Sequence, residues 1–90
     1  GLTARPGDRV VVRVPADWLI LRWEGSDHPL AGDAANVWPA VAVSDPGRQI
    51  DVPVPARAGT SIATYTLWVR TVDGRVVGSL SVLVRIRVAG

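Results

Sequence analysis

Two alternating runs of apolar and polar residues flank an Asp-Gly pair near the end of the chain, and this arrangement constrains the fold most. The runs are residues 61–72 and 75–88, with Asp73 and Gly74 between them. Asp-Gly between alternating runs is a strong β-hairpin signal, because both residues tolerate the positive φ angles of a tight turn. The sequence therefore predicts two antiparallel strands joined by a two-residue turn, with Val72 opposite Arg75.

The predicted turn determines which residues lie opposite each other across the hairpin. One face pairs Leu67 with Leu80, and the other face pairs Trp68 with Ser79. The remaining predicted pairs are Tyr65 with Val82, Ala63 with Val84, Val69 with Gly78, Thr66 with Ser81, Thr64 with Leu83, Ile62 with Arg85 and Arg70 with Val77. A shift of one residue would turn arginines toward the core. The pairing therefore predicts one apolar inner face and an outward-facing Trp68.

Five further strands are predicted upstream, at residues 2–5, 9–14, 18–23, 37–43 and 48–54. In the third, we expect Leu19, Leu21 and Trp23 to face inward, because the opposite phase would bury Arg22 without a partner. Pro39 cannot donate a ladder hydrogen bond, which predicts an edge strand or a bulge there. Turn-forming residues predict an irregular stretch at 24–36 and a turn at 44–47.

Seven short strands separated by turn signals are typical of an antiparallel β-sandwich, and we predict an all-β, seven-stranded fold. The 90 residues suffice for one domain, residues 1–90, which we interpret as part of a larger protein. The chain has no cysteine, so disulfides contribute nothing. No apolar run reaches the roughly 18 residues of a membrane-spanning helix, and no signal segment opens the chain.

Ala63, Tyr65 and Leu67, which follow a glycine-bearing loop, resemble the entry to strand F of immunoglobulin-like domains. The resemblance implies an immunoglobulin-like sandwich in which Tyr65 donates a hydrogen bond to upstream backbone and Trp23 is the buried tryptophan of strand C. In lacking a cysteine pair, the chain resembles bacterial immunoglobulin-like or fibronectin type III-like modules.

Four tryptophans and the Tyr65-Thr66 pair also resemble the four-tryptophan immunoglobulin-like domain of autophagy receptors and its bacterial relatives. In that family the paired strand carries a tryptophan on the same face as the tyrosine. Here Trp68 comes three residues after Tyr65 and is predicted to face the other way.

Residues with catalytic or metal-binding chemistry are few. Ser26, Asp27 and His28 are neighbours in sequence, whereas a catalytic triad requires convergence in space. One histidine without cysteine cannot supply a usual zinc site. Hard oxygen ligands for calcium occur at Glu24, Asp27, Asp33 and Asn36, but without EF-hand spacing. We therefore predict no enzyme activity, no metal and no cofactor.

The four tryptophans, in a chain without phenylalanine, are the better lead to a binding surface. Trp38 shares a strand face with Ala40 and Ala42, which favours an outward position. Outward tryptophans can stack on sugar rings or anchor a protein interface. The candidate binding residues are Trp68, Arg70, Trp38 and Trp18. In the alternative reading, Trp68 only packs over Ser79 and is braced by Arg70 through a cation–π contact.

All ten basic residues are arginine, but the net charge is only +2 and the acids are interspersed. Nucleic-acid binding requires basic residues clustered on one face, so it ranks last among the functions. Arg85 and Arg87 share the outer face of the last strand, and Arg70 of the preceding strand is expected to join them. Solvated strand faces routinely carry such charges.

Three functions follow from these patterns. The first is a non-catalytic interaction or spacer module of a larger bacterial surface or secreted protein, whose partners are neighbouring domains or another protein. The second is a carbohydrate-binding module that uses Trp68 with Trp38 or Trp18 on a polysaccharide. The third is a subunit of a protein assembly. The first two place the protein outside the cell or at its surface.

Overall fold

The computed structural model describes residues 2–30, 35–54 and 58–90, and these residues form an all-β fold, as predicted. The strands are β1 (Leu2–Ala4), β2 (Arg9–Arg13), β3 (Trp18–Pro29), β4 (Asn36–Gly47), β5 (Gln49–Pro53), β6 (Gly59–Thr71) and β7 (Val77–Val88). None of the described residues belongs to a helix long and apolar enough to cross a membrane.

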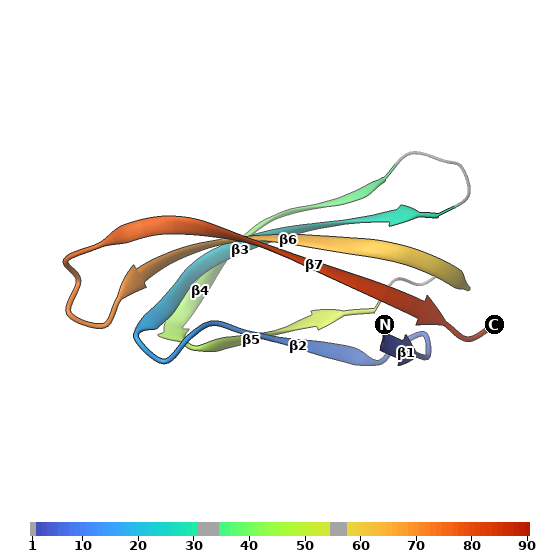
Figure 1. Cartoon of the computed structure of the whole chain (residues 1–90), viewed down its shortest axis with the longest axis horizontal. Coiled ribbons are helices and arrows are strands. Elements are labelled where there is room, and N and C mark those ends of the chain that lie inside the picture. Colours follow the sequence, from blue (N-terminus) through green and yellow to red (C-terminus); the bar gives the residue numbers. More distant parts are fainter. Residues whose placement is uncertain (1, 31–34, 55–57) are drawn as a thin grey trace.

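The strands form two sheets, which appear as two layers in Figure 1. One sheet has five strands in the order β1-β7-β6-β3-β4, and the other contains only β2 and β5. The prediction of a wholly antiparallel arrangement is wrong at β1, which pairs with β7 in parallel, Leu2 opposite Ile86 and Ala4 opposite Val88. The two strands come from opposite ends of the chain, so no hairpin turn dictates their relative direction.

The predicted register of the β6–β7 hairpin is confirmed from Ile62 opposite Arg85 to Arg70 opposite Val77, whereas Val72 and Arg75, predicted to pair, lie in the connecting loop. The predicted two-residue turn is wrong. The Thr71 N–H donates to the Val76 carbonyl, and a wider loop lies between them. Only Gly74 in this loop has a positive φ, of 76°. The register is unchanged because the loop is widened by one residue on each side of Asp73-Gly74, namely Val72 and Arg75.

Asp73 stabilises this loop through its side chain. Its carboxylate accepts hydrogen bonds from the Thr71 hydroxyl at 2.7 Å and from the Arg75 N–H at 3.0 Å. These two donors, the hydroxyl first, lower the pKa of Asp73. The aspartate therefore supports a turn, as its position suggested, but a wider one with different backbone angles.

The core lies between the two sheets. On β6 every second residue from Ser61 to Val69 is buried, and the residues between them are half-buried. The smaller sheet contributes the predicted inward residues of β2 and β5, and β7 contributes its last apolar residues. The buried apolar residues are Ala4, Val10, Val12, Val14, Ile20, Ile50, Val52, Val54, Ala63, Tyr65, Leu67, Val69, Ile86 and Val88. One alternating face from each sheet thus supplies the core.

The start of β3 differs from the prediction. Trp18 and Ile20 face the core, whereas Leu19 and Leu21 were expected there. The pairing with β6 is irregular between Ile20 and Arg22, which leaves Leu21 as an extra residue. A bulge reverses the side-chain alternation. Trp23 therefore packs against the core as expected, and Arg22 stays exposed.

β3 and β4 are longer than predicted. Residues 24–29 continue β3 despite their turn-forming composition, because they pair with β6 on one side and with β4 on the other. Pairing with a central strand outweighs weak local preference. Residues 44–47 likewise continue β4, and Gly47 lies opposite Ile20. Only Arg48 separates β4 from β5, so the chain passes between the sheets there.

The prediction for Pro39 is confirmed. β4 is an edge strand, and its pairing with β3 shifts between Trp23 opposite Val41 and Gly25 opposite Trp38. One residue of β3, Glu24, thus lies opposite two residues of β4, Pro39 and Ala40. A bulge at the edge accommodates a residue without an N–H.

Candidate functional site

The side of the five-stranded sheet that faces away from β2 and β5 is the candidate site, and we call it the outer face. The register defines it by alternation with the buried residues. Its residues are Thr3 of β1, Leu19, Arg22, Glu24, Ser26 and His28 of β3, Val37 and Ala42 of β4, Thr60, Ile62, Thr64, Thr66, Trp68 and Arg70 of β6, and Val77, Ser79, Ser81, Leu83, Arg85 and Arg87 of β7.

Trp68 lies near the centre of the outer face, as predicted, and is half-buried. The Arg22 guanidinium covers its ring, 4.0 Å from the ring centroid, in a cation–π contact. The expected brace, Arg70, instead donates hydrogen bonds to the Thr71 and Val72 carbonyls. Arg22 is the partner because it lies directly opposite Trp68 on β3.

Trp38 does not share the outer face, so the expectation of an outward indole is wrong. Its ring stacks on Tyr65, with centroids 6.3 Å apart and planes 9° apart, and packs against the core. The bulge at Pro39 reverses the alternation that the prediction assumed. Trp18 also packs against the core. Trp68 is therefore the only one of the three candidate tryptophans on the outer face.

Tyr65 occupies the middle of the core face. It meets Trp23 edge-on, with centroids 6.3 Å apart and planes 69° apart, besides its stack with Trp38. Its hydroxyl has no hydrogen-bond partner among the described residues, so the expected bond to upstream backbone is not formed there. Burial, and then the charge of Asp27, raise the pKa of Tyr65.

We expect the raised pKa of Tyr65 to weaken the fold at alkaline pH. Neutral Tyr65 contributes stability that is present below the unfolded pKa of about 10 and is lost as the pH rises through the higher folded value. The chain has one tyrosine, no lysine and no cysteine, so phenolate absorbance reports on Tyr65 alone. The phenol should titrate at higher pH in the folded protein than in denaturant.

Tyr65→Phe is the control for this prediction. It should remove the alkaline loss of stability that comes from the phenol, while the ring contacts remain. Equal phenol pKa values in the folded and denatured protein would contradict the prediction.

The residues with potential catalytic or metal chemistry do not converge in the described structure. Glu24 lies on the outer face and Asp27 on the core face, while Asp33 lies outside the described residues. No three His, Cys, Asp or Glu side chains among the described residues are grouped to hold a metal ion. The Ser26 hydroxyl forms a 2.7 Å hydrogen bond with that of Thr64.

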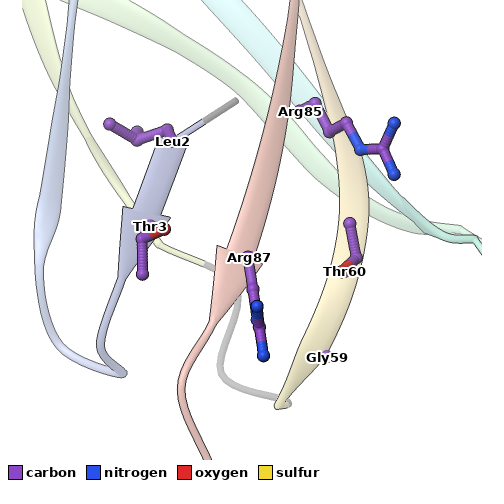
Figure 2. Close-up of a pocket in the computed structure, with 6 residues that line it drawn as sticks. All are labelled: Leu2, Thr3, Gly59, Thr60, Arg85 and Arg87. Atoms are coloured by element: carbon purple, nitrogen blue, oxygen red, sulfur yellow. The ribbon is translucent and has the colours of Figure 1, made fainter.

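Two open hollows mark the outer face. The larger, about 530 Å³, lies where β1, β7 and β6 run side by side, and Figure 2 shows its lining. Its lining residues are Leu2, Thr3, Gly59, Thr60, Arg85 and Arg87. The smaller, about 110 Å³, is lined by Glu24, Gly25, Ser26, Val37, Thr64 and Thr66. Alternation along β7 predicted that Arg85 and Arg87 share a face. The contribution of Leu2 and Thr3 was missed, because it depends on the parallel β1–β7 pair.

Comparisons with protein-family models, with curated proteins and with solved structures find no match to this chain.

Proposed function

We propose that the chain is a non-catalytic interaction module with an immunoglobulin-like sandwich fold, part of a larger bacterial surface or secreted protein. Its interaction surface is the outer face of the five-stranded sheet. The smaller sheet covers only the opposite face, so this face is available to a neighbouring domain or another partner.

Strand order supports the immunoglobulin-like part of the proposal. The four neighbouring strands β7-β6-β3-β4 of the larger sheet match the G-F-C-C′ order of variable-type domains when strands are lettered by their order along the chain. β2 and β5 correspond to the neighbouring B and E strands of the opposite sheet. β1 pairs in parallel with β7, so it lies in the larger sheet and not beside β2.

The single observation that carries the functional proposal is the apolar content of the outer face. Val77 and Leu83 are 68% and 66% exposed. Val77 is the diagonal neighbour of Trp68, and Leu83 is the diagonal neighbour of Ile62. Exposed apolar patches with a polar rim are typical of a surface that meets a partner.

The second candidate, carbohydrate binding, is favoured by the position of Trp68 on this face. It no longer has Trp18 or Trp38 as further stacking platforms, since both pack against the core. It differs from the first candidate in its dependence on the indole. Trp68→Ala should abolish sugar binding, whereas a protein partner would also depend on Val77 and Leu83.

Amide chemical-shift mapping with a panel of polysaccharides and with adjacent domains of the parent protein tests the proposal. We expect shifts in β3, β6 and β7, and no turnover of the same panel in hydrolysis assays. The Val77→Ser/Leu83→Ser variant should weaken binding. Val11→Ser, at an exposed position on β2, is the matched control and should bind normally.

Two results would overturn the proposal. The first is turnover of a substrate by the isolated chain. The second is a set of shifts confined to β2 and β5, which would place the interaction on the smaller sheet. Light scattering completes the test, because self-association lost in Val77→Ser/Leu83→Ser would favour the assembly subunit.

A further inference from the structure

We infer that the outer face binds an extended acidic polysaccharide, with Arg85 and Arg87 holding carboxylates at one end and Arg22 and Arg70 at the other. This inference rests on the second candidate of the proposed function, carbohydrate binding, because it names the ligand class of the same face. The described residues of the outer face include four arginines and one carboxylate, that of Glu24. The face is therefore strongly basic, although the whole chain carries a net charge of only +2.

No carboxylate among the described side chains neutralises the guanidinium groups on this face, although Arg70 also donates to the Thr71 and Val72 carbonyls. Among the described side chains, the only ion pair joins Arg75 to Asp73 in the β6–β7 loop, at 3.9 Å. Arg85 and Arg87 are exposed. Arg22 covers Trp68 with its guanidinium, and such stacking leaves the N–H groups at the edge of the plane able to donate. Charge complementarity thus selects an anionic partner.

The arrangement of the arginines fits a polymer better than a single small anion. Arg85 and Arg87 are alternate residues on β7, about 7 Å apart along the strand. Figure 2 shows their side chains pointing in different directions, Arg85 toward β6 and Arg87 along the end of the sheet. Arg22 lies opposite Trp68, six residues along β6 from the partner of Arg85, a distance of about 20 Å. Charges repeated along an extended chain would meet both groups.

Hydroxyl groups occupy the space between the two pairs of arginines. Ser26 and Thr64 are hydrogen-bonded to each other beside the smaller hollow. The central hydroxyl residues are Ser26, Thr64, Thr66, Ser79 and Ser81. Hydroxyls both donate and accept, so they suit a ligand that is itself rich in hydroxyls. Val77 adds exposed apolar surface beside the Arg22–Trp68 pair.

Two other classes of polyanion fit less well. An acidic peptide that adds to a sheet pairs with an edge strand, here β1 or β4, whereas the four arginines lie on β3, β6 and β7. Single-stranded nucleic acid is bound by successive exposed aromatic side chains, and among the described residues of this face Trp68 is the one tryptophan, tyrosine or phenylalanine, and Arg22 covers it. Carboxylates spaced along a sugar polymer use the arginines and the hydroxyls together.

Fluorescence anisotropy with labelled oligogalacturonate tests the inference, and methyl-esterified oligogalacturonate is the matched uncharged ligand. We expect binding to the first only, and weaker binding as salt is raised. The double variant Arg85→Gln/Arg87→Gln should weaken binding by at least about tenfold, because each of its two substitutions removes a charge-assisted hydrogen bond. Arg9→Gln/Arg13→Gln removes the same charge from exposed positions on β2 and should bind normally.

Thermal unfolding of both double variants establishes whether they fold. If Arg85→Gln/Arg87→Gln does not fold, the single variant Arg87→Gln replaces it and should show an intermediate loss of binding. Equal binding of the esterified ligand, or equal losses in the two double variants, would overturn the inference. Shift mapping separates it from the proposed function. Binding of poly-L-glutamate or single-stranded DNA to the outer face in place of oligogalacturonate would refute the polysaccharide ligand, while the outer face would remain the interaction surface. Oligogalacturonate shifts confined to β2 and β5 would refute both.

Discussion

Replacing Leu67 with alanine is expected to lower the free energy of unfolding by about 2–5 kcal/mol. Leu67 is fully buried and lies between Trp23 on β3 and Leu80 on β7. The substitution removes buried methyl groups and leaves a cavity that the two flanking strands cannot close without losing their pairing. A loss of this size is a large part of the roughly 5–15 kcal/mol that stabilises a typical domain.

Leu83→Ala is the matched control, because Leu83 lies on the same hairpin but on the outer face and is mostly exposed. Its effect should stay within about 0.5 kcal/mol. Urea unfolding followed by tryptophan fluorescence measures both values. Comparable losses in the two variants, or a larger loss for Leu83→Ala, would contradict the register of the hairpin.

The second large effect is expected at Gly25, where alanine should destabilise the fold by about 1–3 kcal/mol. A Cβ atom built there comes 2.4 Å and 2.8 Å from two ring carbons of Trp38, and 3.1 Å from Cδ1 of Tyr65. Trp38 lies across the bare glycine backbone in its stack on Tyr65. Alanine at this position would displace the indole and expose the core beneath it.

Gly78→Ala provides the matched control for this substitution. A Cβ built at Gly78 has no other heavy atom within 4 Å, and β7 continues on both sides of it. Removing a strand glycine without a clash should stabilise by about 0.5–1 kcal/mol. Thermal unfolding should therefore give shifts of opposite sign for the two variants. A Gly25→Ala protein as stable as Gly78→Ala would refute the close packing of Trp38.

A double-mutant cycle attributes the Gly25 effect to Trp38. In a Trp38→Ala background the ring that obstructs the new methyl group is gone, so Gly25→Ala should cost much less than in the natural sequence. An unchanged cost in that background would assign the effect to the backbone of Gly25.

The alternation of apolar residues carried the successful predictions. Leu67 and Leu80, and equally Trp68 and Ser79, lie opposite each other because the side chains of a strand alternate with a period of two over any length without a bulge. The inward residues of β2 and β5 follow for the same reason. For the candidate site, this local rule was enough to place Trp68, Arg85 and Arg87 on one outer face.

The failures occur where an extra residue or a distant strand intervenes. The irregularity after Ile20 reversed the expected facing of Leu19 and Leu21, and the bulge at Pro39 turned Trp38 inward. Residues 24–29 became strand because neighbouring strands satisfy their backbone groups. Each of these outcomes depends on a pairing partner far away in the sequence, which local patterns do not specify.

The amino-acid sequence by itself determined the all-β class, the final hairpin with its register and the face on which each of its side chains lies. The tertiary structure alone decided that β1 joins β7 in parallel and that Arg22, instead of Arg70, covers Trp68. The physical reason is the range of the interactions. Alternation and turn chemistry act between residues close along the chain, whereas sheet pairing and bulges depend on which distant segments pair their backbone groups.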